Sequence, residues 1–76
     1  MLEKIVDIIR RTLELDEETE LSEQTTMEDI PEWDSFGQIS LLSEFEKEFK
    51  IKFSFDEMIA INSVASILDI LKKRKL

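Results

Sequence analysis

Apolar residues return at helical spacing in three separate stretches of this chain. Within residues 2–15, the apolar positions that share one helical face are Leu2, Ile5, Val6, Ile9 and Leu13, and Ile8 broadens that face. Within residues 35–49, the corresponding stripe consists of Leu41, Leu42, Phe45 and Phe49, continued toward its N-terminal end by Gln38. The last stretch begins at Val64 and continues through Ile67, Leu68 and Leu71. Each pattern predicts an amphipathic α-helix.

A shorter helix is predicted between the second and third of these stretches. Residues 50–53 alternate like a strand, but nothing else in the chain reads as a partner strand, so an extended connector is expected. Ser54 is followed three residues later by Glu57, a capping-box pattern that predicts a short helix through Ala60. Asn62 and Ser63 then end that helix and cap the last one.

Residues 16–34 show no helical or strand period and are rich in acidic, turn and cap residues. The isolated apolar residues expected to pin this loop onto the core are Leu21, Met27, Ile30 and Trp33. Pro31 disfavours a helical conformation at the residue before it. A loop this long in so short a chain is unusual and is often functional.

These elements predict an all-α fold, a small four-helix bundle with three main helices, a short third helix and a long loop between the first two. Residues 1–76 are expected to form a single domain, because the chain is near the lower size limit for independent folding. The chain has no cysteine and no histidine, so thiol chemistry is excluded and the commonest general base and metal ligand are absent. We therefore expect a protein that is not an enzyme and that holds no metal.

The net charge of −8 is concentrated in the middle of the chain. Residues 16–57 contain fourteen acidic residues against three lysines, whereas residues 58–76 carry a net positive charge. Such a field repels nucleic acid and attracts basic protein surfaces. Self-repulsion and the lack of an evident apolar surface patch favour a monomer. No stretch reads as a membrane span or a signal peptide, so a cytoplasmic location is expected.

The segment Trp33-Asp34-Ser35-Phe36 joins the acidic loop to the second helix. Ser35 is expected in the first turn, near unpaired N–H groups and the positive end of the helix dipole, an environment that favours a bound phosphate. The alternative is that Asp34 and Ser35 only cap the helix. Phe36 falls roughly 160° from the buried stripe, so it is either bent back by the helix start or exposed beside Ser35. Gly37 weakens the helix, which is tolerable if a partner backbone approaches there.

The order of these features resembles the acyl carrier proteins over nearly the whole chain. The resemblance rests on the amphipathic first helix, the loop from Leu21 to Trp33, the Asp34-Ser35-Phe36 segment, and the order of the helices that follow. It implies that Ser35 is the attachment point of 4′-phosphopantetheine and that Asp34 helps a phosphopantetheinyl transferase position magnesium and coenzyme A. The chain would then carry acyl groups as thioesters between a loading ligase or acyltransferase and the enzymes that use them.

The resemblance also assigns roles to other residues. The residues expected to dock on partner enzymes are Phe36, Ile39, Glu44, Glu46 and Glu48, with Asp34 beside them. The residues that could open to shelter an acyl chain are Leu42, Phe53, Met58, Ile59 and Ile61, for which ordinary core packing is the alternative.

Departures from the family pattern leave the cargo open. Phe36 stands where these carriers usually have leucine, and the first turns of the second helix are less acidic than in typical fatty-acid carriers, which suggests a specialised biosynthetic pathway. Peptidyl carriers usually have glycines before the site, where this chain has Glu32-Trp33, so they match less well. A D-alanyl carrier of cell-wall modification is an alternative. So is an acidic helical interaction module without a prosthetic group.

Overall fold

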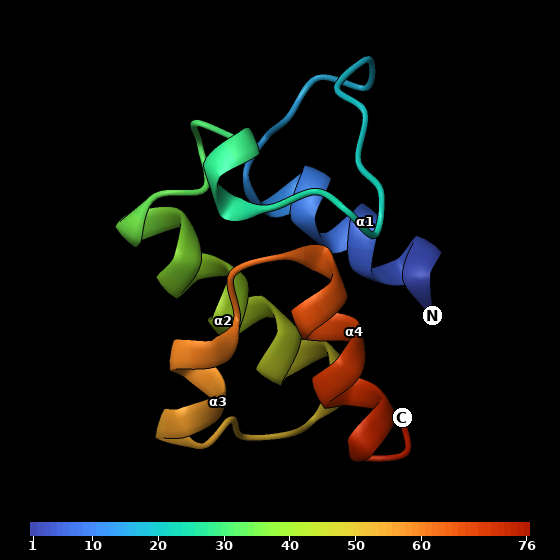
Figure 1. The fold of residues 1–76 in the computed structure, drawn as a ribbon, viewed down its shortest axis with the longest axis vertical. Helices are drawn as coiled ribbons and strands as arrows, with labels where there is room; N and C mark the ends of the chain where they lie inside the picture. Colours follow the sequence, from blue (N-terminus) through green and yellow to red (C-terminus); the bar gives the residue numbers. More distant parts are fainter.

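Four α-helices and one short 3₁₀ helix form the structure, a computed structural model that describes residues 1–76 (Figure 1). In chain order they are α1 (Leu2–Thr12), η1 (Met27–Asp29), α2 (Ser35–Phe49), α3 (Phe55–Ala60) and α4 (Val64–Lys73). The predicted all-α bundle with a short third helix and a long loop between the first two is confirmed. Residues 50–53 contain no strand, as expected, and α2 has the predicted bounds.

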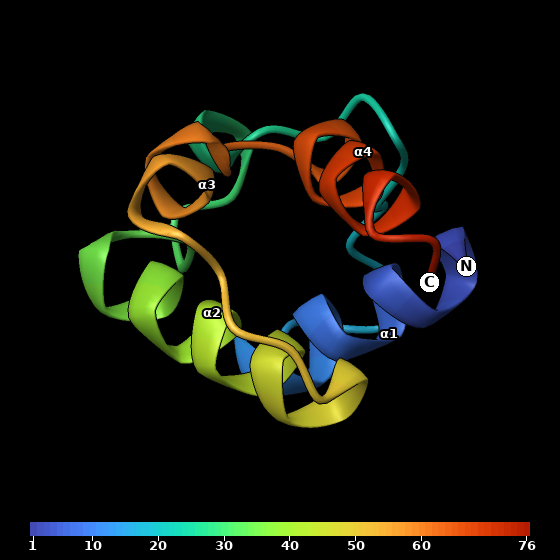
Figure 2. The same ribbon diagram turned by 90° about the horizontal axis from the view of Figure 1, so that it is seen from below.

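The helices are arranged as two pairs that face each other across the core. Viewed from below, α1 and α2 lie along one side and α3 and α4 along the other (Figure 2). The loop between α1 and α2 crosses one end of the bundle, where it contains η1 (Figure 1). None of the four α-helices combines the length and the apolar character that a membrane span requires.

A single cluster of fifteen buried apolar residues holds the bundle together. Helix α4 contributes five of them and α1 three, so these two helices supply the larger part of the core. The loop adds Ile30 and Trp33, while Leu21 and Met27 pack partly buried against the cluster. The four apolar loop residues therefore pin the loop to the core, as the sequence predicted.

Helix α1 ends at Thr12, earlier than the predicted stretch to residue 15. Glu14 adopts a left-handed conformation with φ of 54°, and the Leu15 N–H donates to the Arg10 carbonyl at 2.9 Å. These features form a Schellman motif, which satisfies the last carbonyls and turns the chain away from the helix axis. Leu13 nevertheless remains buried beyond the helix end, so the apolar period extends one residue past the helix itself.

The loop is tied to the junction between α3 and α4 by backbone hydrogen bonds. The Met27 N–H donates to the Asn62 carbonyl at 2.8 Å, and the Val64 N–H donates to the Thr25 carbonyl at 3.0 Å. A reciprocal capping box between Thr26 and Asp29 stabilises η1. The stretch expected to be irregular is thus an ordered strap that leads directly to the start of α2.

Helix α3 contains no buried residue. The predicted capping box is present, since the Ser54 hydroxyl accepts from the Glu57 N–H and the Glu57 carboxylate accepts from the Ser54 N–H. Arg74, at the end of α4, donates to the Glu57 carboxylate at 2.6 Å and to the Lys52 carbonyl at 2.7 Å. Polar contacts, rather than buried side chains, therefore fasten the N-terminal end of α3.

Candidate functional site

Ser35 is the first residue of α2 and is exposed, and Asp34 is the N-cap residue before it. The Asp34 Oδ1 atom accepts a hydrogen bond from the Gly37 N–H at 2.9 Å. The cap is therefore made by Asp34, and the Ser35 hydroxyl lies in solvent. The sequence left open whether Asp34 and Ser35 both only cap the helix. In the structure Asp34 makes the cap, and Ser35 is left accessible to a reactant.

The start of α2 fits a phosphate ester on Ser35. The first N–H groups of a helix have no partner within it, and the helix dipole places partial positive charge at this end. The first turn of α2 itself contains no acidic residue, and the carboxylate next to it is the Asp34 cap on the Gly37 N–H. An exposed hydroxyl at such a position suits attachment of 4′-phosphopantetheine, whose phosphate would lie beside these N–H groups.

Gly37 is buried, which corrects the expectation that it leaves a bare surface for a partner. A Cβ atom at this position would lie 2.4 Å from the Glu32 carbonyl oxygen and 3.0 Å from Leu13 Cδ2. The backbone that approaches closely here is the chain's own loop, immediately before the site. The glycine therefore lets the Glu32 segment pack against α2 and so positions Ser35.

Gln38 connects three parts of the molecule around the site. Its Oε1 accepts from the indole Nε1 of Trp33 at 2.7 Å, and its Nε2 donates to the Ile61 carbonyl at 2.8 Å and to the Met58 carbonyl at 3.4 Å. The sequence placed Gln38 on the buried stripe but did not predict this bridge. The sequence did contain a signal for it: Gln38 is a polar residue on a buried stripe, and buried polar groups need hydrogen-bond partners.

Two apolar side chains flank Ser35 on the surface. Phe36 is 83% exposed and Ile39 is 66% exposed. Of the two positions considered for Phe36, the structure has the exposed one, with the ring facing solvent beside Ser35. The part that Phe36 and Ile39 play in docking remains a prediction.

The acidic residues of α2 are paired within the molecule. Glu44 lies 3.8 Å from Arg11 and 3.5 Å from Lys47, and Glu48 lies 3.5 Å from Lys4. The Glu46 carboxylate accepts from the Phe53 N–H at 2.9 Å. The three carboxylates expected to face partner enzymes are thus engaged with α1, α2 itself and the connector to α3.

The five residues considered for an acyl pocket do not line a common cavity. Phe53 and Ile61 are buried in the core, and Leu42 and Met58 are partly buried against it. Ile59 differs from the expectation, because it is 65% exposed on the outer side of α3. The three surface hollows of the structure are lined by other residues.

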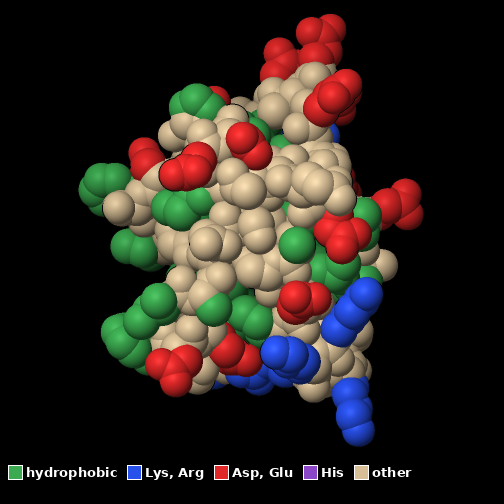
Figure 3. Space-filling model, in the orientation of Figure 1, with side chains coloured by type: hydrophobic (Ala, Val, Ile, Leu, Met, Phe, Trp, Pro, Cys, Tyr) green, Lys and Arg blue, Asp and Glu red, His purple; other side chains and the backbone are tan.

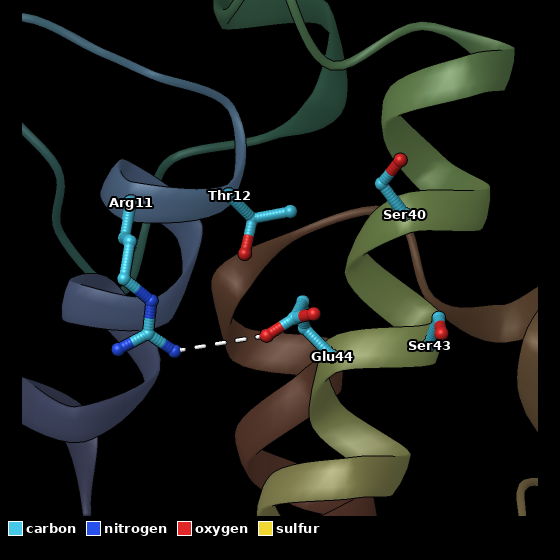
Figure 4. Close-up of a pocket in the computed structure, with 5 residues that line it drawn as sticks. All are labelled: Arg11, Thr12, Ser40, Ser43 and Glu44. Carbon is cyan, nitrogen blue, oxygen red and sulfur yellow. Dashed lines mark ion pairs between the residues drawn. The ribbon is translucent and has the colours of Figure 1, made fainter.

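One of these hollows is an open polar groove between α1 and α2, with a volume of about 430 Å³ (Figure 4). The residues that line it are Arg11, Thr12, Ser40, Ser43 and Glu44. Arg11 and Glu44 form an ion pair across it, and the buried Thr12 hydroxyl has no hydrogen-bond partner. A lining without any apolar side chain does not suit an acyl chain, and the groove does not include Ser35.

Comparisons with known proteins point to one family. The sequence model of the phosphopantetheine attachment site family matches residues 3–71. An acyl carrier protein of Buchnera aphidicola subsp. Baizongia pistaciae (strain Bp) is 39% identical over 70 residues, covering 92% of this chain and 88% of the relative.

Solved structures show the same likeness. A proposed acyl carrier protein from Mycobacterium tuberculosis has a TM-score of 0.81 at 27% identity, covering 93% of each chain. The solution structure of holo acyl carrier protein from Geobacter metallireducens has a TM-score of 0.83 at 29% identity, covering 95% of this chain and 82% of that one. The likeness therefore extends over nearly the whole fold.

Proposed function

Because this chain belongs to the acyl carrier protein family, whose prosthetic group is 4′-phosphopantetheine, we propose that it carries thioester-bound intermediates on Ser35. The observation that supports this assignment is the position of Ser35. Its hydroxyl is exposed at the first residue of α2, while the neighbouring Asp34 supplies the helix cap. A thiol on the attached arm gives this cysteine-free chain the group it needs to form thioesters.

The loading step needs only a nucleophile from this chain. The Ser35 Oγ attacks the β-phosphate of coenzyme A and forms a new O–P bond, while the bond to the bridging oxygen breaks and adenosine 3′,5′-bisphosphate leaves. The hydroxyl proton passes to a base of the phosphopantetheinyl transferase, which also supplies the metal site. The carrier is therefore a substrate of that enzyme rather than a catalyst.

Asp34 has two roles in this proposal. Its Oδ1 accepts from the Gly37 N–H and so holds the first turn of α2 in place. Its second carboxylate oxygen is left for the magnesium ion that accompanies coenzyme A on the transferase. Asp34→Asn would keep a cap, because asparagine is an equally good cap residue, and would remove the charge.

The cargo is proposed to be an acyl group, in a specialised biosynthetic pathway rather than bulk fatty acid synthesis. Phe36 beside the attachment point and the uncharged first turn of α2 support that choice. The partners are a phosphopantetheinyl transferase, a loading ligase or acyltransferase, and enzymes that use the acyl group, all in the cytoplasm. A D-alanyl cargo is the alternative. The mass of the loaded protein from its own cells, before and after hydroxylamine cleavage of thioesters, distinguishes the two.

Intact mass spectrometry tests the attachment directly. The protein is incubated with coenzyme A, magnesium and a broad-specificity phosphopantetheinyl transferase, alongside Ser35→Ala and the matched variant Ser40→Ala. Ser40 is an exposed serine on the same helix. We expect one phosphopantetheine increment on the wild type and on Ser40→Ala, and none on Ser35→Ala. An unmodified wild type with several transferases would support an interaction module without a prosthetic group instead.

A further inference from the structure

One polar side chain spans the junction between the start of α2 and the end of α3. Gln38 lies three residues after Ser35, about one helical turn further along α2 and on nearly the same side of it. Its Oε1 accepts from the Trp33 indole N–H, and its Nε2 donates to the carbonyls of Met58 and Ile61. Gln38 thus joins the loop, α2 and α3 next to the attachment point.

These hydrogen bonds are costly to break. Trp33 is buried, so water cannot readily replace the Gln38 oxygen as the acceptor for its N–H. Met58 belongs to the last turn of α3 and Ile61 follows the helix, so their carbonyls have no N–H partner within it. Displacement of Gln38 would therefore leave a buried donor and the carbonyls at a helix end unpaired.

The core behind Gln38 has no space ready for an acyl chain. Leu41, Phe45, Phe53 and Ile61 are all buried. None of these four side chains lines any of the three surface hollows. Close-packed interiors resist added volume, so an entering chain would have to displace several of these side chains as well as Gln38.

Apolar side chains are available on the outside of the same junction. Ile39 follows Gln38 and Ile59 follows Met58, and both isoleucines are exposed. Figure 3 shows hydrophobic side chains at the surface along the edge formed by α2 and α3. An acyl group that stays outside the core therefore finds apolar contacts near Ser35 without any movement of α3.

We propose that Gln38 closes the passage between α2 and α3, so that this carrier keeps its acyl cargo outside the helical core. The inference rests on the proposed carrier function and specifies the cargo. A long saturated chain gains much from burial, which this carrier does not provide, so the cargo is a short acyl group or one with polar substituents. Gln38 is then a specificity-determining residue, and Leu42, Phe53, Met58 and Ile61 serve as ordinary core.

The test compares the reactivity of two acyl thioesters on the carrier. A broad-specificity phosphopantetheinyl transferase loads the protein from acetyl-CoA or octanoyl-CoA, and intact mass verifies each increment. Hydroxylamine then attacks the acyl carbonyl, the C–S bond breaks, and the hydroxamic acid and the free thiol are released. Each rate is divided by the rate for the same acyl-CoA, which removes the intrinsic difference between the two thioesters. An octanoyl chain is long enough to enter the core, whereas an acetyl group is not.

The wild type and three variants give different expected rates. On the wild type both relative rates should stay within about twofold of one, because a group outside the core is always accessible. On Gln38→Ala the octanoyl rate should fall about tenfold, which corresponds to burial of about two methylene groups, and the acetyl rate should not change. Gln38→Met keeps the length of the side chain without its hydrogen bonds and should fall between the two. Gln24→Ala, at an exposed loop glutamine, is the matched control and should behave like the wild type.

Backbone amide shifts measured by NMR supply a second readout. Replacement of acetyl by octanoyl should shift only amides near Ser35 in the wild type, and should also shift those of Leu41 and Phe45 in Gln38→Ala. A purely structural role of Gln38 would alter both loaded forms alike, without dependence on chain length. If Gln38→Ala does not fold, as judged by circular dichroism, the wild type and Gln38→Met still decide the result.

Three outcomes would overturn the proposal. An octanoyl thioester that is protected on the wild type shows that the chain enters the core despite Gln38. Variants at Gln38 that leave the octanoyl thioester as reactive as on the wild type contradict the role of this residue. Equal protection of acetyl and octanoyl groups in those variants assigns Gln38 a structural role around Ser35 alone. These results leave the carrier function standing, whereas a wild type that gains no increment from coenzyme A removes that function itself.

Discussion

Helices α4 and α3 are neighbours in sequence but are held in opposite ways. Helix α4 buries five apolar residues in the common core. Helix α3 buries none and is fastened at its ends, by the Ser54–Glu57 capping box with Arg74 at one end and by Gln38 at the other. Apolar burial is worth more than surface hydrogen bonds and ion pairs. The structure therefore divides into a firmly packed part around α1 and α4 and a loosely held α3.

This difference matters because α3 packs Met58 against the core and leaves Phe55 and Ile59 exposed. A helix with few buried contacts opens locally at low free energy, while the rest of the fold stays intact. Met58 of α3 and Leu42 of α2 pack partly buried against the core, and Ile61 at the end of α3 is buried in it. All three belong to the group expected to admit an acyl chain. Movement of α3 would expose these residues without unfolding α1 and α4. The following predictions test how much the contributions of α3 and α4 to the stability of the fold differ.

The largest difference is expected between two isoleucines. Ile67 of α4 is fully buried, whereas Ile59 of α3 is 65% exposed. Ile67→Ala should lower the free energy of unfolding by about 3 kcal/mol, because it leaves a cavity in the core. Ile59→Ala should change it by less than about 0.5 kcal/mol, as an exposed substitution. Urea denaturation of both variants measures this, and equal losses would contradict the division.

Removal of the Gln38 bridge should loosen α3 selectively. Gln38→Ala leaves the Trp33 indole N–H and the Ile61 carbonyl without their partner, at a cost of about 2 kcal/mol. Hydrogen exchange should show faster exchange of amides in α3 and little change in the middle of α4. Gln24→Ala, at an exposed loop glutamine, serves as the control and should exchange like the wild type. Uniform loss of protection across all helices would argue against a separately held α3.

The firmly packed part extends to the loop before Ser35, and Gly37→Ala tests this. Alanine favours the helix by about 1 kcal/mol over glycine. Its Cβ would nevertheless lie 2.4 Å from the Glu32 carbonyl oxygen, and overpacking of this kind costs about 1–3 kcal/mol. We expect a net loss of about 1 kcal/mol by thermal unfolding, whereas Ser40→Ala, exposed on the same helix, should gain slightly. A Gly37→Ala protein more stable than the wild type would show that the Glu32 segment moves away from the added Cβ without a loss of stability.

The smallest effect is expected from the Arg74–Glu57 contact. The hydrogen bond from Arg74, together with that from the Ser54 N–H, lowers the pKa of Glu57 below its ordinary value of 4.5. A lowered pKa means that the ionised form stabilises the fold above the unfolded-state pKa, and that this contribution is lost as the pH falls through the folded-state value. At neutral pH, Glu57→Gln should cost less than about 1 kcal/mol, because the pair is partly exposed.

The pH dependence of Tm separates this contact from the destabilisation that low pH causes in any acidic protein. The difference in Tm between wild type and Glu57→Gln should be largest near pH 7 and should narrow as the pH falls below about 4. Asp69→Asn, at an exposed acid of α4, provides a control whose difference should stay small throughout. A Glu57→Gln difference that grows toward acid pH would reverse the assigned sign.

Much of the fold could be predicted from residues that act on their near neighbours. The stripe from Leu41 to Phe49 predicted α2 because burial of one helical face needs only the spacing of three or four residues. The Ser54–Glu57 box predicted the start of α3 because its two hydrogen bonds join residues three apart. The early end of α1 was missed, since the Schellman motif places Glu14, rather than a glycine, in the left-handed conformation.

The predictions that differed from the structure concern whether a residue is covered by another part of the chain or exposed to solvent. Gly37 was interpreted as open surface, yet it faces the Glu32 carbonyl. Ile59 was assigned to the interior, yet a helix with only six residues and polar fastenings leaves it in solvent. An apolar surface patch was not expected, although Phe36, Ile39, Phe55 and Ile59 are all exposed. None of these facts follows from periodicity, because a helical period does not say how deeply a helix is covered.

The sequence by itself determined the order of the helices, the loop pinned by its apolar residues and the serine at a helix start, because propensity, spacing and capping act over a few residues. The tertiary structure alone decided that the α2 acids pair with Lys4, Arg11 and the connector. It also decided that Gln38 joins the loop to α3, and that Phe36 and Ile39 are exposed beside Ser35. Those features depend on which groups meet across the bundle, and such pairs are set by the packing of distant segments.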